Sequence, residues 1–249
     1  MATTTKAPET SQSRQAPFLV ELYKTSMGKK YAMAISGIMM LGYVFAHMVG
    51  NLKLYLPDHD GIPAIDHYGE FLRESLLVPI LPETGMLWIL RLALLGALAV
   101  HLHAAWSLTV ANRRARPESY RSPRNYQLAT FASRSMRWTG VIVLLYIVFH
   151  LADITWGTEG IAAGNWEQGS VKANLIGSLS RPGVAFFYLL ANTALGIHLY
   201  HGVWSLFQTL GVGSAKGKDW RRMAATGFTS IVVIGNLSFP IAILTGAVS

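Results

Sequence analysis

The chain has 249 residues, of which 51% are hydrophobic and only 14% are charged. Because a soluble domain usually carries about 25% charged residues, this composition disfavours a soluble protein and indicates a membrane protein. The formal net charge is +8, but the basic residues lie between apolar runs, which argues against nucleic-acid binding. With no cysteine, the chain alone cannot ligate an ordinary iron–sulfur cluster or carry a covalent c-type haem.

Residues 1–22 are polar and rich in Thr, Ser and Gln up to about residue 16, which predicts a flexible cytoplasmic N-terminus. Five later stretches are long and apolar enough to cross a bilayer, which takes about 20 residues. They cover residues 31–52, 86–111, 139–156, 184–210 and 224–248. The sequence therefore predicts an all-α integral membrane bundle of five transmembrane helices within residues 23–249.

Basic residues fall mainly in the N-terminal segment and in the links after the second and fourth stretches, which hold 16 of the 21. The other two links carry most of the acidic residues. Because Lys and Arg accumulate on the cytoplasmic side, the N-terminus is expected inside and the C-terminus outside. The protein is expected to be a multi-pass protein of the inner (plasma) membrane.

The two outer links differ in their patterns. Residues 66–77 have spaced apolar positions and predict a short helix at the membrane surface. Residues 157–182 show no such pattern. No internal repeat is recognised beyond the alternation of histidine-bearing helices.

Histidines occur in four of the five apolar stretches, where an ionisable side chain usually indicates function. His47 and His150 come late in helices that run outward, so both are expected towards the outer leaflet. His101 and His198 lie well past the start of helices that run inward, so both are expected towards the inner leaflet. Two histidines at each of two depths is the arrangement that two bis-histidine b haems need.

Alternatives remain for single histidines. A lone intramembrane histidine is often a helix–helix hydrogen-bonding group. A proton relay or a metal-ion transporter is a further alternative, although such a transporter would bring clustered acidic or sulfur ligands that the spans lack. His103 and His201 are second candidates for the haem pair expected at the inner level.

Two charged residues lie near the outer histidines. Asp153 follows His150 by three residues and is a candidate quinone or proton site. Arg91 lies in the outer part of the second helix, where it is a candidate partner of haem propionates or of Asp153. The alternatives are an interfacial acid and an arginine that extends to the interface.

Several segments resemble the single-polypeptide, five-helix cytochrome b anchor of succinate dehydrogenase and fumarate reductase. They are Ser26-Met-Gly-Lys-Lys-Tyr-Ala-Met-Ala-Ile-Ser-Gly37, His47-Met-Val-Gly-Asn51, His101 with Asn112-Arg-Arg-Ala-Arg-Pro117, His150-Leu-Ala-Asp153 and His198-Leu-Tyr-His-Gly-Val-Trp-Ser-Leu-Phe-Gln-Thr-Leu-Gly211. The resemblance covers nearly the whole chain from about residue 23.

This resemblance implies a subunit of respiratory complex II, which takes part in the tricarboxylic acid cycle. It implies two b haems, one held by His47 and His150 and the other by His101 and His198, and a quinone that is usually menaquinone. The implied partners are a flavoprotein subunit that performs the succinate chemistry, an iron–sulfur subunit and membrane lipid. The alternatives are a haem-free quinone-binding anchor and a di-haem b subunit of another membrane dehydrogenase.

Overall fold

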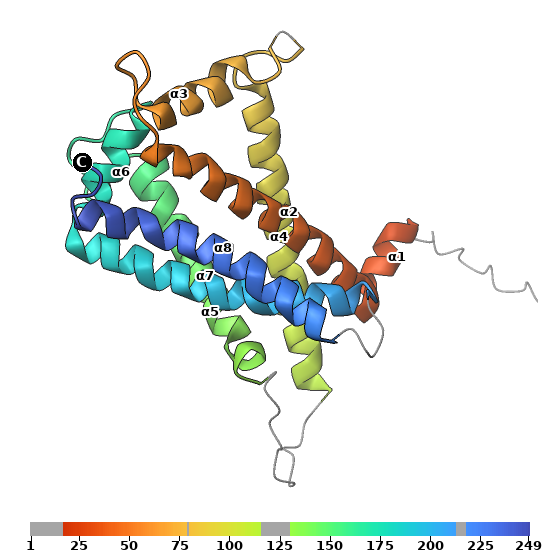
Figure 1. The fold of residues 1–249 in the computed structure, drawn as a ribbon. Helices are drawn as coiled ribbons and strands as arrows, with labels where there is room; N and C mark the ends of the chain where they lie inside the picture. Colours follow the sequence, from red (N-terminus) through yellow and green to blue (C-terminus); the bar gives the residue numbers. More distant parts are fainter. Residues whose placement is uncertain (1–16, 79, 116–129, 213–217) are drawn as a thin grey trace, which may run out of the picture.

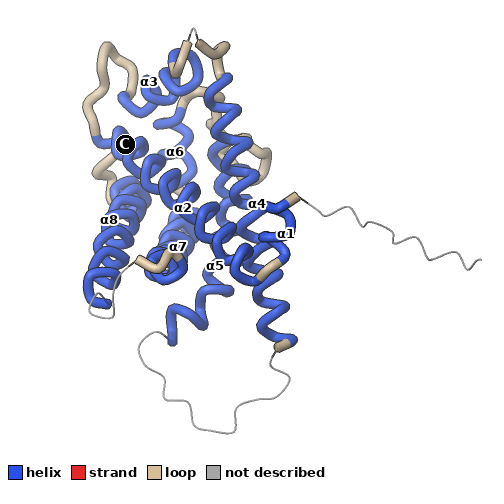
Figure 2. Tube along the Cα trace, turned by 90° about the vertical axis from the view of Figure 1, so that its right-hand side faces the viewer, coloured by secondary structure: helices blue, strands red, loops and turns tan. Residues whose placement is uncertain are grey.

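A computed structural model describes residues 17–78, 80–115, 130–212 and 218–249. Most of the polar segment expected to be flexible therefore lies outside the described residues, as do Arg116, Arg121 and Arg124 of the basic link. In the described part of the chain, all regular structure is helical and no strand forms (Figure 2). The all-α prediction is confirmed.

Five helices are long and apolar enough to cross a membrane. They are α2 (Ser26–Asn51), α4 (Gly85–Arg114), α5 (Thr130–His150), α7 (Pro182–Thr209) and α8 (Lys218–Leu244). Each predicted span lies largely within one of them. Their starts have local causes: the Thr25 side chain caps α2 by accepting from the Gly28 amide at 2.9 Å, and Pro182 occupies the first turn of α7.

The helices pack in antiparallel pairs. The helix α2 contacts α4, and α7 contacts both α5 and α8; α7 and α8 run side by side (Figure 1). The central helix is α7, which buries more side chains than its neighbours, from Ala185 to Val203. One end of the bundle carries α3 (Ala64–Glu70), α6 (Val171–Leu179) and the C-terminus, and the other carries α1 (Phe18–Lys24). These are called the α3 end and the α1 end.

The outer surface of the bundle is apolar. Large side chains such as Trp88, Leu92, Leu95 and Trp106 of α4 are well exposed, whereas a buried apolar cluster lies at the α3 end. That cluster consists of Leu54, Ile65, Leu179, Ala185, Tyr188, Phe239 and Ile243. A surface on which apolar side chains face outward along five long helices suits lipid rather than water.

Short helices occupy the links. The surface helix expected in residues 66–77 forms as α3, which continues into η2 (Phe71–Ser75), a π-helical turn. Two helices lie where none was expected: α6 in the link 157–182, and α1, whose first residues fall within the segment predicted to be flexible. A 3-10 turn, η1 (Leu52–Tyr55), follows α2, and a π-helical turn, η3 (Leu151–Thr155), follows α5.

Candidate functional site

His47 of α2 and His150 of α5 face each other near the α3 end of the bundle. Their ring centroids lie 5.9 Å apart and the rings are almost perpendicular, at 82°. Tyr43 and Tyr146 flank the two rings at 5.5 and 5.7 Å. Two histidines that are 103 positions apart are thus brought together by the packing of separate helices.

His101 of α4 and His198 of α7 form a second pair nearer the α1 end. Their ring centroids lie 6.5 Å apart, at an interplanar angle of 59°. Each ring rests on a glycine of the neighbouring helix: a Cβ atom on Gly37 would lie 3.7 Å from His101 Cε1, and one on Gly140 would lie 3.3 Å from His198 Cε1. Glycine at these positions lets each imidazole approach the helix backbone closely.

All four histidines are held through the same ring atom. Nδ1 of His101 lies 3.2 Å from the Met33 carbonyl oxygen and 3.4 Å from Ser36 Oγ. Nδ1 of His198 lies 3.5 Å from Thr139 Oγ1, that of His150 lies 3.1 Å from the Tyr188 hydroxyl, and that of His47 lies 3.1 Å from the Asn51 amide. No hydrogen bond joins Nε2 of any of the four to another described residue, so Nε2 is the ring nitrogen that has no hydrogen-bond partner there.

The ring spacing can be compared with the spacing that two axial imidazoles require. A metal–imidazole bond is about 2 Å long, and a ring nitrogen lies about 1.1 Å from its ring centroid, so two rings on opposite sides of one metal ion have centroids about 6 Å apart. The observed 5.9 and 6.5 Å agree with this value. Both pairs therefore have the ring spacing that bis-histidine coordination requires.

The two pairs lie at different levels of the bundle. His47 follows Gly37 by ten residues and His150 follows Gly140 by ten residues. At 1.5 Å of rise per residue, the pairs are about 15 Å apart along the helices. In the described part of the chain, no three His, Asp or Glu side chains gather into a metal-ion site. Each pair is separate, which suits two planar cofactors better than one multi-ligand ion.

His103 and His201 are turned to other partners. The Tyr23 hydroxyl of α1 lies 2.6 Å from His103 Nδ1, and the two rings stack at 5.7 Å. Nε2 of His201 lies 3.2 Å from Ser205 Oγ, its Nδ1 is buried without a partner in the described chain, and its ring contacts Trp204. Neither ring forms a ring pair with His101 or His198.

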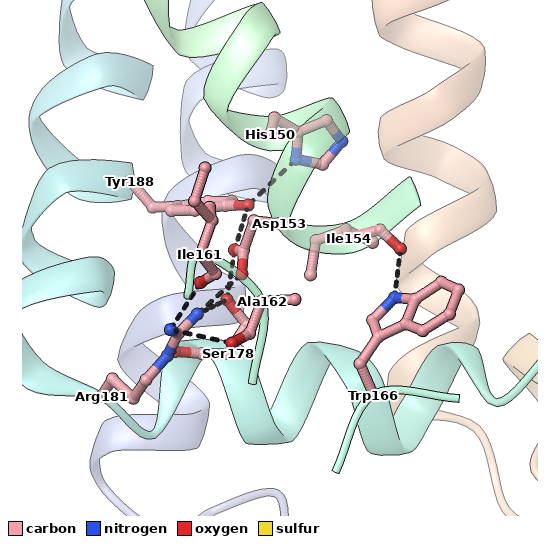
Figure 3. Close-up of polar contacts among 9 residues, drawn as sticks. All are labelled: His150, Asp153, Ile154, Ile161, Ala162, Trp166, Ser178, Arg181 and Tyr188. Carbon is pink, nitrogen blue, oxygen red and sulfur yellow. Dashed lines mark hydrogen bonds and ion pairs between the residues drawn. The ribbon is translucent and has the colours of Figure 1, made fainter. Parts of the chain in front are cut away.

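Asp153 is enclosed by polar partners that the sequence did not reveal. Its side chain has no exposed area, and Arg181 Nη2 donates to Oδ1 at 2.6 Å. The hydroxyls of Ser178 and Tyr188 both donate to Oδ2 (Figure 3). The π-helical turn η3 widens the chain where α5 ends and places Asp153 inside, as such turns often do near functional residues.

Asp153, one of the two candidate partners of Arg91, does not pair with it. Arg91 lies over the Trp88 ring at 5.1 Å, and the partner of Asp153 is Arg181. The available signal for Arg181 was an arginine directly before Pro182, where α7 begins.

Matching contacts show an internal repeat that the sequence reading missed. Met33, Ser36, Gly37, Tyr43 and His47 of α2 recur with identical spacing in α5. The counterparts are Met136, Thr139, Gly140, Tyr146 and His150. In both copies the Ser or Thr, together with the glycine, contacts a histidine of the next long helix, His101 or His198. The two histidine levels therefore arise from one motif used twice.

The α5–α7 half of this arrangement is similar to a known family. A family model described as the succinate dehydrogenase/fumarate reductase transmembrane subunit matches residues 112–237, about half of the chain. The match includes His150 and His198, whereas His47 and His101 lie before it. Neither the curated proteins nor the solved structures compared with this chain contain a match.

Proposed function

Because this chain belongs to the succinate dehydrogenase/fumarate reductase transmembrane subunit family, it is a membrane subunit of such a complex, and we propose that it binds two b haems and a quinone. The supporting observation is the presence of two histidine pairs at two levels, each with the ring spacing of a bis-histidine site. A single buried histidine would be weak support, but four histidines here form two pairs, and each of the four makes its hydrogen bond through Nδ1.

The proposed ligands are His47 and His150 for one haem and His101 and His198 for the other. His103 and His201 are not chosen, since Tyr23 and Ser205 engage them away from these pairs. When bound there, b haems supply one-electron carriers between an iron–sulfur partner and the quinone, which is proposed to be menaquinone.

The surrounding side chains orient the imidazoles. The Met33 carbonyl can only accept, so His101 Nδ1 must carry the proton and Nε2 keeps its lone pair. Ser36 donates to the backbone at 2.7 Å, which leaves its oxygen to accept from the same ring. Such outer contacts fix the tautomer and the ring direction of a ligating histidine.

Asp153 remains the proposed quinone or proton site near the His47–His150 pair. It is connected through Tyr188 to His150 and through the Arg181 side chain, 35% exposed, to the surface of the α3 end. A hydrogen-bonded path of this kind can hold a proton between the surface and the buried pair. Arg91 lies over Trp88 and does not pair with Asp153, so Arg91 is still proposed as a contact of haem propionates.

The flavoprotein and iron–sulfur subunits are proposed to dock at the α1 end. That end gathers Lys24, Lys29, Lys30, Arg113, Arg114, Arg221 and Arg222. The α3 end instead carries Asp58, Asp60, Asp66, Glu70, Glu159 and Glu167. The positive-inside rule then places the α1 end in the cytoplasm, in the inner (plasma) membrane.

Purification of the whole complex tests this function. We expect a reduced-minus-oxidised spectrum with a b-type α band, a haem-to-protein ratio of two, and flavoprotein and iron–sulfur subunits with succinate:quinone activity. Absence of the α band would identify a haem-free anchor instead. Co-purification with a hydrogenase or formate dehydrogenase would assign the subunit to another membrane dehydrogenase.

A further inference from the structure

The Tyr188 hydroxyl stands between a histidine and a carboxylate. Its oxygen lies 3.1 Å from His150 Nδ1 and 3.0 Å from Asp153 Oδ2 (Figure 3). Tyr188 is 4% exposed and the Asp153 side chain is fully buried. The three groups come from α5, η3 and α7, and they form a continuous chain of hydrogen bonds inside the bundle.

The direction of these hydrogen bonds follows from the number of protons. The Arg181 guanidinium donates to Asp153 Oδ1 at 2.6 Å, and the Ser178 and Tyr188 hydroxyls donate to Oδ2, so both carboxylate oxygens act as acceptors. The single hydroxyl proton of Tyr188 is therefore donated to Asp153. The hydroxyl oxygen is left to accept from His150, which must carry its proton on Nδ1 and present an unprotonated Nε2.

His150 differs from the other three histidines in having a carboxylate behind the group that its Nδ1 contacts. Nδ1 of His47 meets the neutral Asn51 amide, that of His101 meets a backbone carbonyl and that of His198 meets Thr139. Within the described residues, only His150 has an anion behind its hydrogen-bond partner. A carboxylate placed in this way makes an imidazole a stronger electron donor to a metal.

We propose that Tyr188 and Asp153 are positioning residues that make His150 the strongest electron donor of the four histidines, and so lower the reduction potential of the site that it shares with His47. The inference rests on the proposed function, because it concerns haem held by these residues. Arg181 and Ser178 contribute by holding the carboxylate in place and filling its remaining acceptor positions.

A redox titration of the purified complex, followed through the b-haem absorbance, tests the inference with the variant Tyr188→Phe. This variant removes one oxygen atom and keeps the ring contacts with Tyr146 and Phe149. We expect the midpoint potential of one haem to shift to a more positive value while the other stays in place. The electron paramagnetic resonance signal of the shifted haem should also change, since its His150 ring is no longer held at Nδ1.

The matched control is Tyr146→Phe, which removes the hydroxyl of the other tyrosine beside His150. Its shift should be smaller than that of Tyr188→Phe, because no hydrogen bond joins Tyr146 to the imidazole among the described residues. Asp153→Asn should shift the same haem in the same direction as Tyr188→Phe. If the complex with Asp153→Asn does not assemble, the midpoint potentials of the Tyr188→Phe complex alone test the inference.

The possible failures are distinguishable. A wild-type complex without b haem would overturn the proposed function. A wild-type complex with two haems, together with a Tyr188→Phe complex in which neither potential nor spectrum changes, would overturn the inference and leave the function standing. Equal shifts in both haems would overturn it as well.

Discussion

Asp153 and Arg181 form a 2.6 Å ion pair although they are 28 residues apart in the chain. The carboxylate follows α5 and the guanidinium precedes α7, so the pair ties together two helices that each supply one histidine to a different level. Arg181 also donates to the Ile161 carbonyl at 2.7 Å, which attaches the link between α5 and α6 to the same point.

Removing Arg181 should destabilise the protein. Arg181→Ala leaves the buried Asp153 charge uncompensated, and breaking a buried pair in this way costs about 3 kcal/mol or more. The thermal midpoint of the detergent-solubilised protein should fall clearly. In the control Asp58→Ala, the lost contact is an exposed 3.5 Å pair with Lys172, so the midpoint should change little. Equal losses in the two variants would contradict this account of Asp153.

The four proposed ligands should fall into two groups when each is replaced by alanine. His47→Ala and His150→Ala should each lower the haem-to-protein ratio from two to about one and should remove the same haem from the redox titration, because bis-histidine coordination needs both imidazoles. His101→Ala and His198→Ala should remove the other haem. His103→Ala and His201→Ala serve as controls and should keep a ratio of two. Loss of haem in His103→Ala with retention in His101→Ala would reverse the assignment.

Two glycines should differ in their tolerance of alanine. A methyl group on Gly140 would lie 3.3 Å from His198 Cε1, so the imidazole must shift by a few tenths of an ångström. A methyl group on Gly37 would lie 3.7 Å from His101 Cε1, which is an ordinary contact. Gly140→Ala should therefore alter the electron paramagnetic resonance signal of one haem, whereas Gly37→Ala should not. The opposite order would show that the close approach at Gly140 is unimportant.

Tyr23 should anchor α1 without affecting the haems. Its hydroxyl lies 2.6 Å from His103, so Tyr23→Phe removes a hydrogen bond between α1 and α4. Limited proteolysis near residue 18 should become faster, while the haem-to-protein ratio stays at two. Loss of a haem in this variant would indicate that His103, rather than His101, faces the cofactor.

The histidine-bearing helices could be predicted from the sequence because each depends only on the residues of its own segment. Long apolar stretches form helices that can span a membrane, and a rise of 1.5 Å per residue converts sequence position into depth. The five spans were found in this way, and the short helix α3 was found from the spacing of apolar residues within 66–77. The helix α6 was missed because residues 157–182 show no helical pattern by themselves, and its buried residues Asn174 and Ser178 are polar.

The repeat shared by α2 and α5 is present in the sequence, but it became evident only from the contacts that its residues make with histidines of the neighbouring helices. Ser36 and Thr139 are unremarkable hydroxyl residues in apolar helices, and each becomes informative when a histidine of the next long helix lies against it. The spacing from Gly37 to His47 and from Gly140 to His150 then explains why two equivalent levels exist.

The sequence by itself determined the class of protein, the five spans and the two levels at which the four proposed ligands lie, because hydrophobic length and helical rise act along one chain segment. Only the tertiary structure decided which of the candidate histidines at the inner level face each other. The direction in which a side chain leaves its helix depends on the packing of neighbouring helices, so His101 and His198 meet while His103 and His201 turn to Tyr23 and Ser205. The same packing selected Arg181, not Arg91, as the partner of Asp153.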